Sequence, residues 1–184
     1  MVGTWPGLLR RTIGVSAGDL ETLRGSITAA GFASGHRLVV GHWPTSPIGP
    51  FADIMWRDAN DRKHLVASPE AAAYVNGVYP FDHHLHHEVS VRINHDPGRS
   101  RRTTMTVDAG IISLELELGW LSIPFPPRPR LMTATIESWV SRAVLGVRTY
   151  GVSPTGVEEW YRTRSIRRVV AGRGRIDETD LGPL

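Results

Sequence analysis

The chain has 184 residues, of which 41% are hydrophobic and 21% charged, the composition of an ordinary folded domain. It contains no cysteine, which excludes disulfide scaffolds, thiolate metal sites and cysteine nucleophiles. No apolar run approaches the ~20 residues that span a bilayer, and residues 1–11 lack the apolar core of a signal peptide. We therefore expect a single cytoplasmic domain over residues 1–184.

The charge comes almost entirely from arginine. The net charge is +3 and the isoelectric point about 9.8, and Lys63 is the single lysine among 21 basic residues. The arginines are spread along the chain without interleaved aromatic residues, so we expect no nucleic-acid partner. No membrane partner is expected either, whereas a homo-oligomer remains open. One lysine also leaves one candidate for Schiff-base chemistry.

The first half of the chain contains two predicted helices and three predicted strands. A serine N-cap at Ser16 is followed by helical spacing of apolar residues as far as Gly31, which predicts the first helix. Residues 37–43, 51–56 and 64–67 predict strands, the last two joined by the polar connector 57–62. A second, short helix is expected between Ser68 and Gly77, with Pro69 at its first position.

The second half is dominated by predicted hairpins. Residues 82–94 alternate between apolar and polar side chains and predict one strand with two unlike faces. Residues 103–107 and 112–118 predict a hairpin, 120–130 an extended connector and 131–146 a third helix, and the last hairpin combines 147–150 with 157–170. The tail from Gly172 is expected to fray. Together these elements predict an α+β fold, a mostly antiparallel, partly or fully closed β-barrel with about three peripheral helices.

The segment Thr45-Ser46-Pro47-Ile48-Gly49-Pro50-Phe51-Ala52-Asp53 resembles a signature of the acetoacetate decarboxylase-like superfamily. In that family a Thr-Ser-x-x-Gly-x-Tyr/Phe-x-Glu motif leads into a core strand, a hairpin and a short helix, and the same order is expected here over residues 36–95. The stretches 146–151 and 159–161 are similar to a group of actinobacterial proteins. The resemblance implies a barrel whose interior binds a small molecule.

The lysine on which the family's namesake reaction depends is missing from the matching position. The decarboxylases carry it in a Tyr-Pro-Lys-Lys stretch, whereas Tyr79-Pro80 is followed here by Phe81-Asp82, and Lys63 lies in a polar connector. We therefore expect a site without cofactor that acts on a hydrophobic or carbonyl-bearing metabolite without an imine, as a lyase, isomerase or cyclase. A non-catalytic carrier or sensor is the alternative.

Histidines and carboxylates are concentrated in residues 82–88. On a strand, His84, His86 and Glu88 share one face, and His83 and His87 lie on the other, mostly apolar face. Either face can line the interior, and an apolar wall with few polar groups is the commoner pocket. The candidate proton carriers are Asp53, His83, His84 and His87, and the candidate ligand contacts are Trp43, Phe51, Trp56, Tyr79, His86 and Glu88.

A metal-dependent enzyme is a further alternative. A His-x-His pair on a strand with a carboxylate suits Zn, Fe or Mn, and His84, His86 and Glu88 have this pattern. A further ligand would come from His42, His64 or His95. A solvated polar strand face explains the same pattern, so the leading hypothesis uses no metal.

Overall fold

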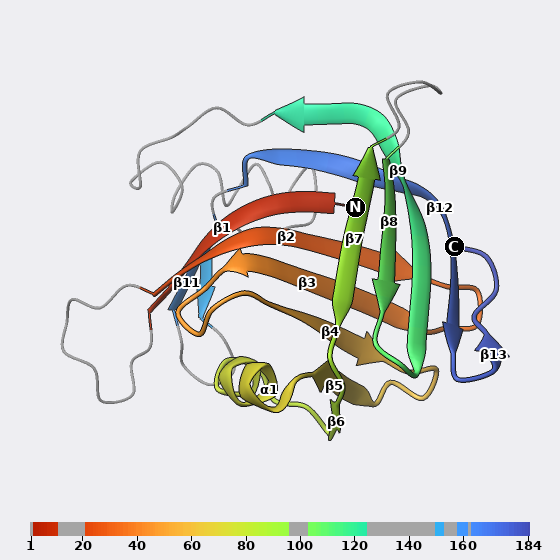
Figure 1. The fold of residues 1–184 in the computed structure, drawn as a ribbon, viewed down its shortest axis with the longest axis horizontal. Coiled ribbons are helices and arrows are strands. Elements are labelled where there is room, and N and C mark those ends of the chain that lie inside the picture. The colour runs from red at the N-terminus through yellow and green to blue at the C-terminus, as the bar shows by residue number, and fades with distance from the viewer. Residues whose placement is uncertain (1, 11–20, 96–102, 125–149, 153–157, 162) are drawn as a thin grey trace.

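The computed structural model describes residues 2–10, 21–95, 103–124, 150–152, 158–161 and 163–184. These residues form thirteen strands and one helix (Figure 1): β1 Val2–Arg10, β2 Glu21–Gly31, β3 Arg37–Thr45, β4 Phe51–Arg57, β5 Lys63–Ala67, α1 Pro69–Asn76, β6 His83–His86, β7 Ser90–His95, β8 Thr103–Asp108, β9 Ile112–Pro124, β10 Tyr150–Val152, β11 Glu158–Tyr161, β12 Ser165–Ile176 and β13 Thr179–Asp180.

The strands hydrogen-bond along one path, in the order β6-β5-β4-β3-β2-β1-β12-β9-β8-β7. Three short strands lie off this path: β11 pairs with β1 and β10, and β13 pairs with β12. Among the described strands, all pairs are antiparallel except β5 with β6, which α1 connects. The predicted closed barrel is wrong, because the described strands leave β6 and β7 as two ends without a ladder between them.

The predicted single strand over residues 82–94 is two strands at opposite ends of the sheet. β6 runs parallel to β5, and the amide of His87 continues this pairing by donating to the carbonyl of Ala67 at 3.1 Å. The chain then crosses to β7, which pairs with β8. Alternation of apolar residues continues through both strands, so the sequence pattern does not mark the change of partner.

The predicted α+β content is also wrong, since the described residues contain one short helix. The first predicted helix is replaced from Glu21 onward by β2, whose backbone pairs with both β1 and β3. The third predicted helix lies outside the described residues. The helix after Ser68 is confirmed as α1: the Ser68 hydroxyl accepts from the amide of Ala71, and Gly77 ends the helix.

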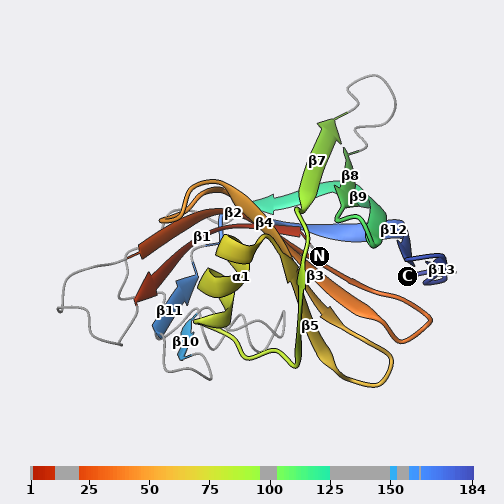
Figure 2. The same ribbon diagram turned by 60° about the horizontal axis from the view of Figure 1, so that its bottom comes forward.

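Two hydrophobic clusters lie on opposite faces of the β3–β5 region. The larger one, which we call the inner core, joins β2–β5 to β8, β9 and β12 through residues such as Ile54, Met105 and Leu116. The ribbon shows β7 and β8 crossing in front of β2–β4 (Figure 1). The smaller cluster, which we call the α1 cluster, packs Trp43, Leu65 and Ala67 against the helix. Figure 2 shows this helix in front of the sheet.

The expected frayed tail is instead part of the sheet. β12 continues to Ile176, and β13 folds back on it. Ile176 is 8% exposed and Leu181 is fully buried in the inner core. The tail is ordered because its apolar side chains cover one end of that core.

Candidate functional site

The carboxyl group of Asp53 is the most buried acidic group in the described part of the chain. Asp53 lies on β4, opposite Gly41 of β3 and Ala67 of β5, and is 1% exposed. Its Oδ1 accepts a hydrogen bond of 2.9 Å from the indole nitrogen of Trp43. Its Oδ2 has no hydrogen-bond partner among the described residues. Because buried polar atoms are nearly always partnered, Oδ2 is a candidate ligand contact.

Burial changes the acidity of this group. Removal from water raises the pKa of Asp53 from its ordinary value to about 6, although the hydrogen bond from Trp43 partly opposes this rise. Near neutral pH both the acid and its conjugate base are therefore accessible. A carboxyl group with this pKa can donate a proton to a ligand or accept one from it.

Apolar and aromatic side chains surround Asp53 on its face of the sheet. The rings of Trp43 and Phe51 lie with their centroids 6.4 Å apart, and Phe51 meets Tyr74 of α1 edge-on at 6.0 Å. The hydroxyl of Tyr74 donates to Glu21 Oε2 at 2.9 Å. Tyr79 also packs against this α1 cluster. Asp53 is therefore surrounded by apolar side chains with few polar groups, a composition that is common in small-molecule sites.

A second set of rings crosses three strands on the opposite face and includes His36, directly before β3. Trp56, His64 and His83 occupy one register row across β4, β5 and β6. Their rings stack at centroid distances of 4.2 Å and 4.9 Å, and His36 stacks on the other side of Trp56 at 5.7 Å. Trp56 Nε1 donates to His36 Nδ1 at 2.9 Å, which fixes the neutral tautomer of His36 with its proton on Nε2. We call these four residues the imidazole–indole stack.

Asp58 anchors this stack at the β4–β5 turn. Its Oδ2 accepts from Arg62 Nε at 2.7 Å and lies 3.3 Å from His64 Nε2, and its Oδ1 accepts from the amides of Asn60 and Arg62. Burial alone would raise the pKa of Asp58, but these bonds outweigh burial and hold the pKa well below its ordinary value. Asp58 therefore remains ionised and orients His64.

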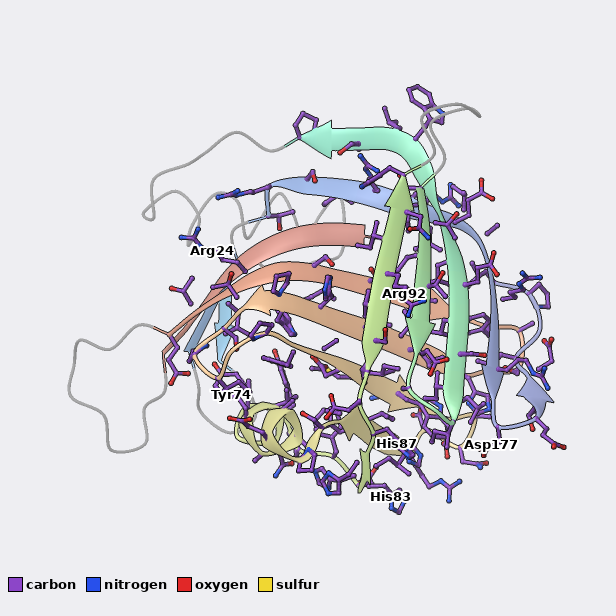
Figure 3. The ribbon with its side chains drawn as sticks, viewed as in Figure 1. Arg24, Tyr74, His83, His87, Arg92 and Asp177 are labelled. Carbon is purple, nitrogen blue, oxygen red and sulfur yellow. The ribbon has the colours of Figure 1, made fainter. Side chains whose placement is uncertain are left out.

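The remaining histidines of residues 82–88 do not converge on Asp53. His84 Nε2 lies 3.0 Å from Asn76 Oδ1, and the side chains of His84, His86 and Glu88 are exposed. His87 is half-buried on the face of the inner core. Its imidazole lies close to Gly110 of the β8–β9 turn, so that a Cβ at Gly110 would be 3.3 Å from His87 Nδ1. Figure 3 shows His83 and His87 below β7, away from Tyr74 beside α1.

No three histidine or acidic side chains of the described residues are grouped so that they could hold a metal ion. His42 and His95, which were also proposed as ligands, lie away from the exposed His84 and His86. His42 lies in the row of Ser26 and Ala52, and burial lowers its pKa. His95 Nδ1 lies 3.0 Å from Thr103 Oγ1. The described residues therefore bring no set of ligands together for the metal alternative.

The structure divides the predicted site residues between two faces. Asp53, Trp43, Phe51 and Tyr79 come together around α1, whereas Trp56, His83 and His87 lie on the face of the inner core. The apolar face of residues 82–94 is thus the one that packs inward, with Leu85, Val89 and Val91 against that core. Sequence reasoning missed Gly41, Tyr74, His36 and Asp58; the only local signal was the Asp58-Ala59-Asn60-Asp61 turn composition.

A scan of family models, a search of curated proteins and a search of solved structures each found no match to this chain. Among the described residues, α1 is the single helix, and no helix has the length and apolarity needed to cross a membrane.

Proposed function

We propose that the chain binds a hydrophobic, carbonyl-bearing small molecule at the Asp53 face and acts on it by proton transfer without an imine. The observation that carries this proposal is the buried Asp53 carboxyl, which has one oxygen held by Trp43 and the other unpartnered among the described residues. The Trp43 bond fixes Oδ1, so Oδ2 is the atom that exchanges a proton with the ligand.

The chemistry of the walls favours an apolar ligand. Trp43, Phe51 and Tyr74 provide aromatic surface, and Ile48 and Met55 pack against the same α1 cluster. In such low-dielectric surroundings a single hydrogen bond from a protonated carboxyl to a ligand carbonyl is strong, because water does not compete for it. The ionised form of Asp53 can remove a proton from the carbon beside that carbonyl.

Lys63 supports a route without an imine. It is exposed at the beginning of β5, and its amide donates to Asp82 Oδ2 at 2.7 Å. A Schiff-base amine has to be desolvated or placed beside another cation to be reactive at neutral pH. Lys63 is exposed to solvent, so its amine is not desolvated.

The test uses 4-phenylbutan-2-one, a hydrophobic ketone, and follows deuterium exchange of its α-protons by NMR in D2O. We expect exchange above the buffer rate with the wild type and a loss of about a hundredfold with Asp53→Asn. Asp177→Asn is the matched control, because Asp177 is exposed and distant from α1 (Figure 3), and asparagine tolerates its φ of 51°.

Three outcomes contradict parts of the proposal. Equal exchange by wild type and Asp53→Asn would remove Asp53 from the reaction. Saturable binding of the ketone without exchange would instead favour a carrier or sensor. Reduction with borohydride in the presence of the ketone should leave Lys63 unmodified, so labelling of Lys63 would restore the imine route.

A further inference from the structure

Large apolar side chains protrude from the sheet where β9 bends. Trp120, Leu121 and Ile123 are 67%, 57% and 51% exposed, and Val170 of β12 is 53% exposed. Val170 borders the same bend, because its Cγ1 lies 3.2 Å from a Cβ built on Gly119. We call Trp120, Leu121, Ile123 and Val170 the β9 patch. Large apolar side chains exposed at neighbouring positions mark an interaction surface more often than scattered ones do.

A β-bulge makes the patch project. The β9–β12 register pairs Leu118 with Val169 and Ser122 with Arg167, so four residue steps on β9 stand opposite two on β12. The additional residues leave the ladder and bend the strand. Pairing of β9 with β8 ends at Leu118. Figure 1 shows the end of β9 turning over beyond β8.

Arginines lie beside the patch. Arg164 and Arg168 are exposed, and Arg167 donates to Thr103 Oγ1 at 3.1 Å. The carbonyl of Arg168 lies 3.3 Å from the Cβ position of Gly119, which places this residue at the bulge. Within the described ranges, no carboxylate forms an ion pair with any of these three arginines. The surface therefore combines protruding apolar groups with positive charge.

We propose that the β9 patch, together with Arg164 and Arg168, binds the surface of an anionic lipid bilayer. Tryptophan favours the interface between headgroups and acyl chains, and arginines are attracted to anionic headgroups. A peripheral contact of this kind needs no membrane-spanning segment.

A second copy of the chain is a poorer occupant of this surface. A two-fold interface places the same patch of both copies together. Arg164 and Arg168 would then face their own equivalents, and like charges at an interface oppose association. The positive charge of Arg164 and Arg168 beside the β9 patch complements an anionic bilayer instead.

The test is co-sedimentation of the full chain with vesicles of phosphatidylcholine alone or of phosphatidylcholine and phosphatidylserine in equal amounts. We expect binding to the anionic vesicles that weakens as salt is raised. Trp120→Ser with Leu121→Ser should weaken binding by tenfold or more, since both substitutions remove apolar surface that would be buried in the bilayer. Arg164→Gln with Arg168→Gln should weaken it by about thirtyfold, at about 1 kcal/mol for each arginine.

Arg173→Gln with Arg175→Gln is the matched control, because it removes the same charge from exposed positions on β12 away from the bulge. This control and Asp53→Asn should bind as the wild type does, which separates the surface from the Asp53 site. If the control lost as much vesicle binding as Arg164→Gln with Arg168→Gln, net charge alone would explain the loss, and the proposal would be overturned. Absence of vesicle binding, or a dimer that Trp120→Ser with Leu121→Ser separates, would also overturn it.

Discussion

Gly41 faces Asp53 across the β3–β4 ladder, and its lack of a side chain leaves the space in which the Asp53 carboxyl meets the Trp43 indole. A Cβ at this position would collide with both Asp53 Oδ1 and Trp43 Nε1. Glycine inside a strand commonly marks such a close approach. The site therefore depends on a residue that itself carries no functional group.

Gly41→Ala should destabilise the fold by about 1–3 kcal/mol, the usual cost of placing extra volume in a packed interior. Urea unfolding followed by circular dichroism measures this change. Gly31→Ala is the control, because a Cβ there meets nothing within 4 Å, and it should change stability by less than about 0.5 kcal/mol. Equal effects of the two substitutions would mean that the carboxyl does not occupy this space.

Asp53→Asn should remove a pH dependence of stability. Because burial raises the pKa of Asp53 to about 6, the folded state binds more protons than the unfolded state between pH 3.8 and 6. The wild type should therefore lose on the order of 3 kcal/mol relative to Asp53→Asn as pH rises through this interval, with no further change above it. Urea unfolding at closely spaced pH values measures the difference, and a constant difference would contradict the assignment.

Two buried threonines should respond in opposite directions to replacement by valine. Thr28 is 1% exposed and its hydroxyl has no partner among the described residues, so Thr28→Val should stabilise the fold by about 1 kcal/mol. Thr103 is 3% exposed, and its hydroxyl contacts His95 and Arg167. Thr103→Val should destabilise by about 1–2 kcal/mol. Thermal unfolding of both variants measures these changes in stability. Stabilisation by both substitutions would show that the contacts of the Thr103 hydroxyl do not stabilise the fold.

Asp58→Asn should lose stability at neutral pH but not in acid. Hydrogen bonds hold the pKa of Asp58 below its ordinary value, so the charged group stabilises the fold above about pH 4 and this contribution disappears as pH falls further. The unfolding curves of wild type and variant should therefore converge in acid. Asp61→Asn, which changes an exposed carboxylate of the same turn, is the control. A gap that persists at low pH would show that the charge of Asp58 is not the cause.

Local signals predicted α1 correctly, whereas β2 shows why apolar spacing alone is not sufficient. The N-cap, the proline and the closing glycine of α1 all lie within ten residues of one another. In β2, Leu23 and Ile27 pack in the α1 cluster, whereas Ala30 packs in the inner core, so both faces of the strand carry apolar residues. Their spacing of four and then three residues resembles that of a helix, although the strand places them on opposite faces of the sheet.

The sequence predicted individual residues of the candidate site, but not which of them would lie side by side. Asp53 lies in a recognisable motif, but its burial depends on Gly41 and Trp43 of the neighbouring strand. Likewise, the imidazole–indole stack requires the parallel register that places His83 beside His64. Such non-local pairings are set by the whole sheet, so four histidines in sequence did not indicate which of them would meet Trp56.

The crossing from β6 to β7 has a consequence for how the sheet is held together. Only residues 87–89 separate the two end strands, and the four residue steps from His86 to Ser90 extend about 14 Å at most. The chain itself is thus a short tether that keeps the open edges of the sheet near each other, although no ladder joins them. A flat sheet with the same strand order would place β6 and β7 much farther apart than this connection can reach, so the connection is compatible only with a curved sheet.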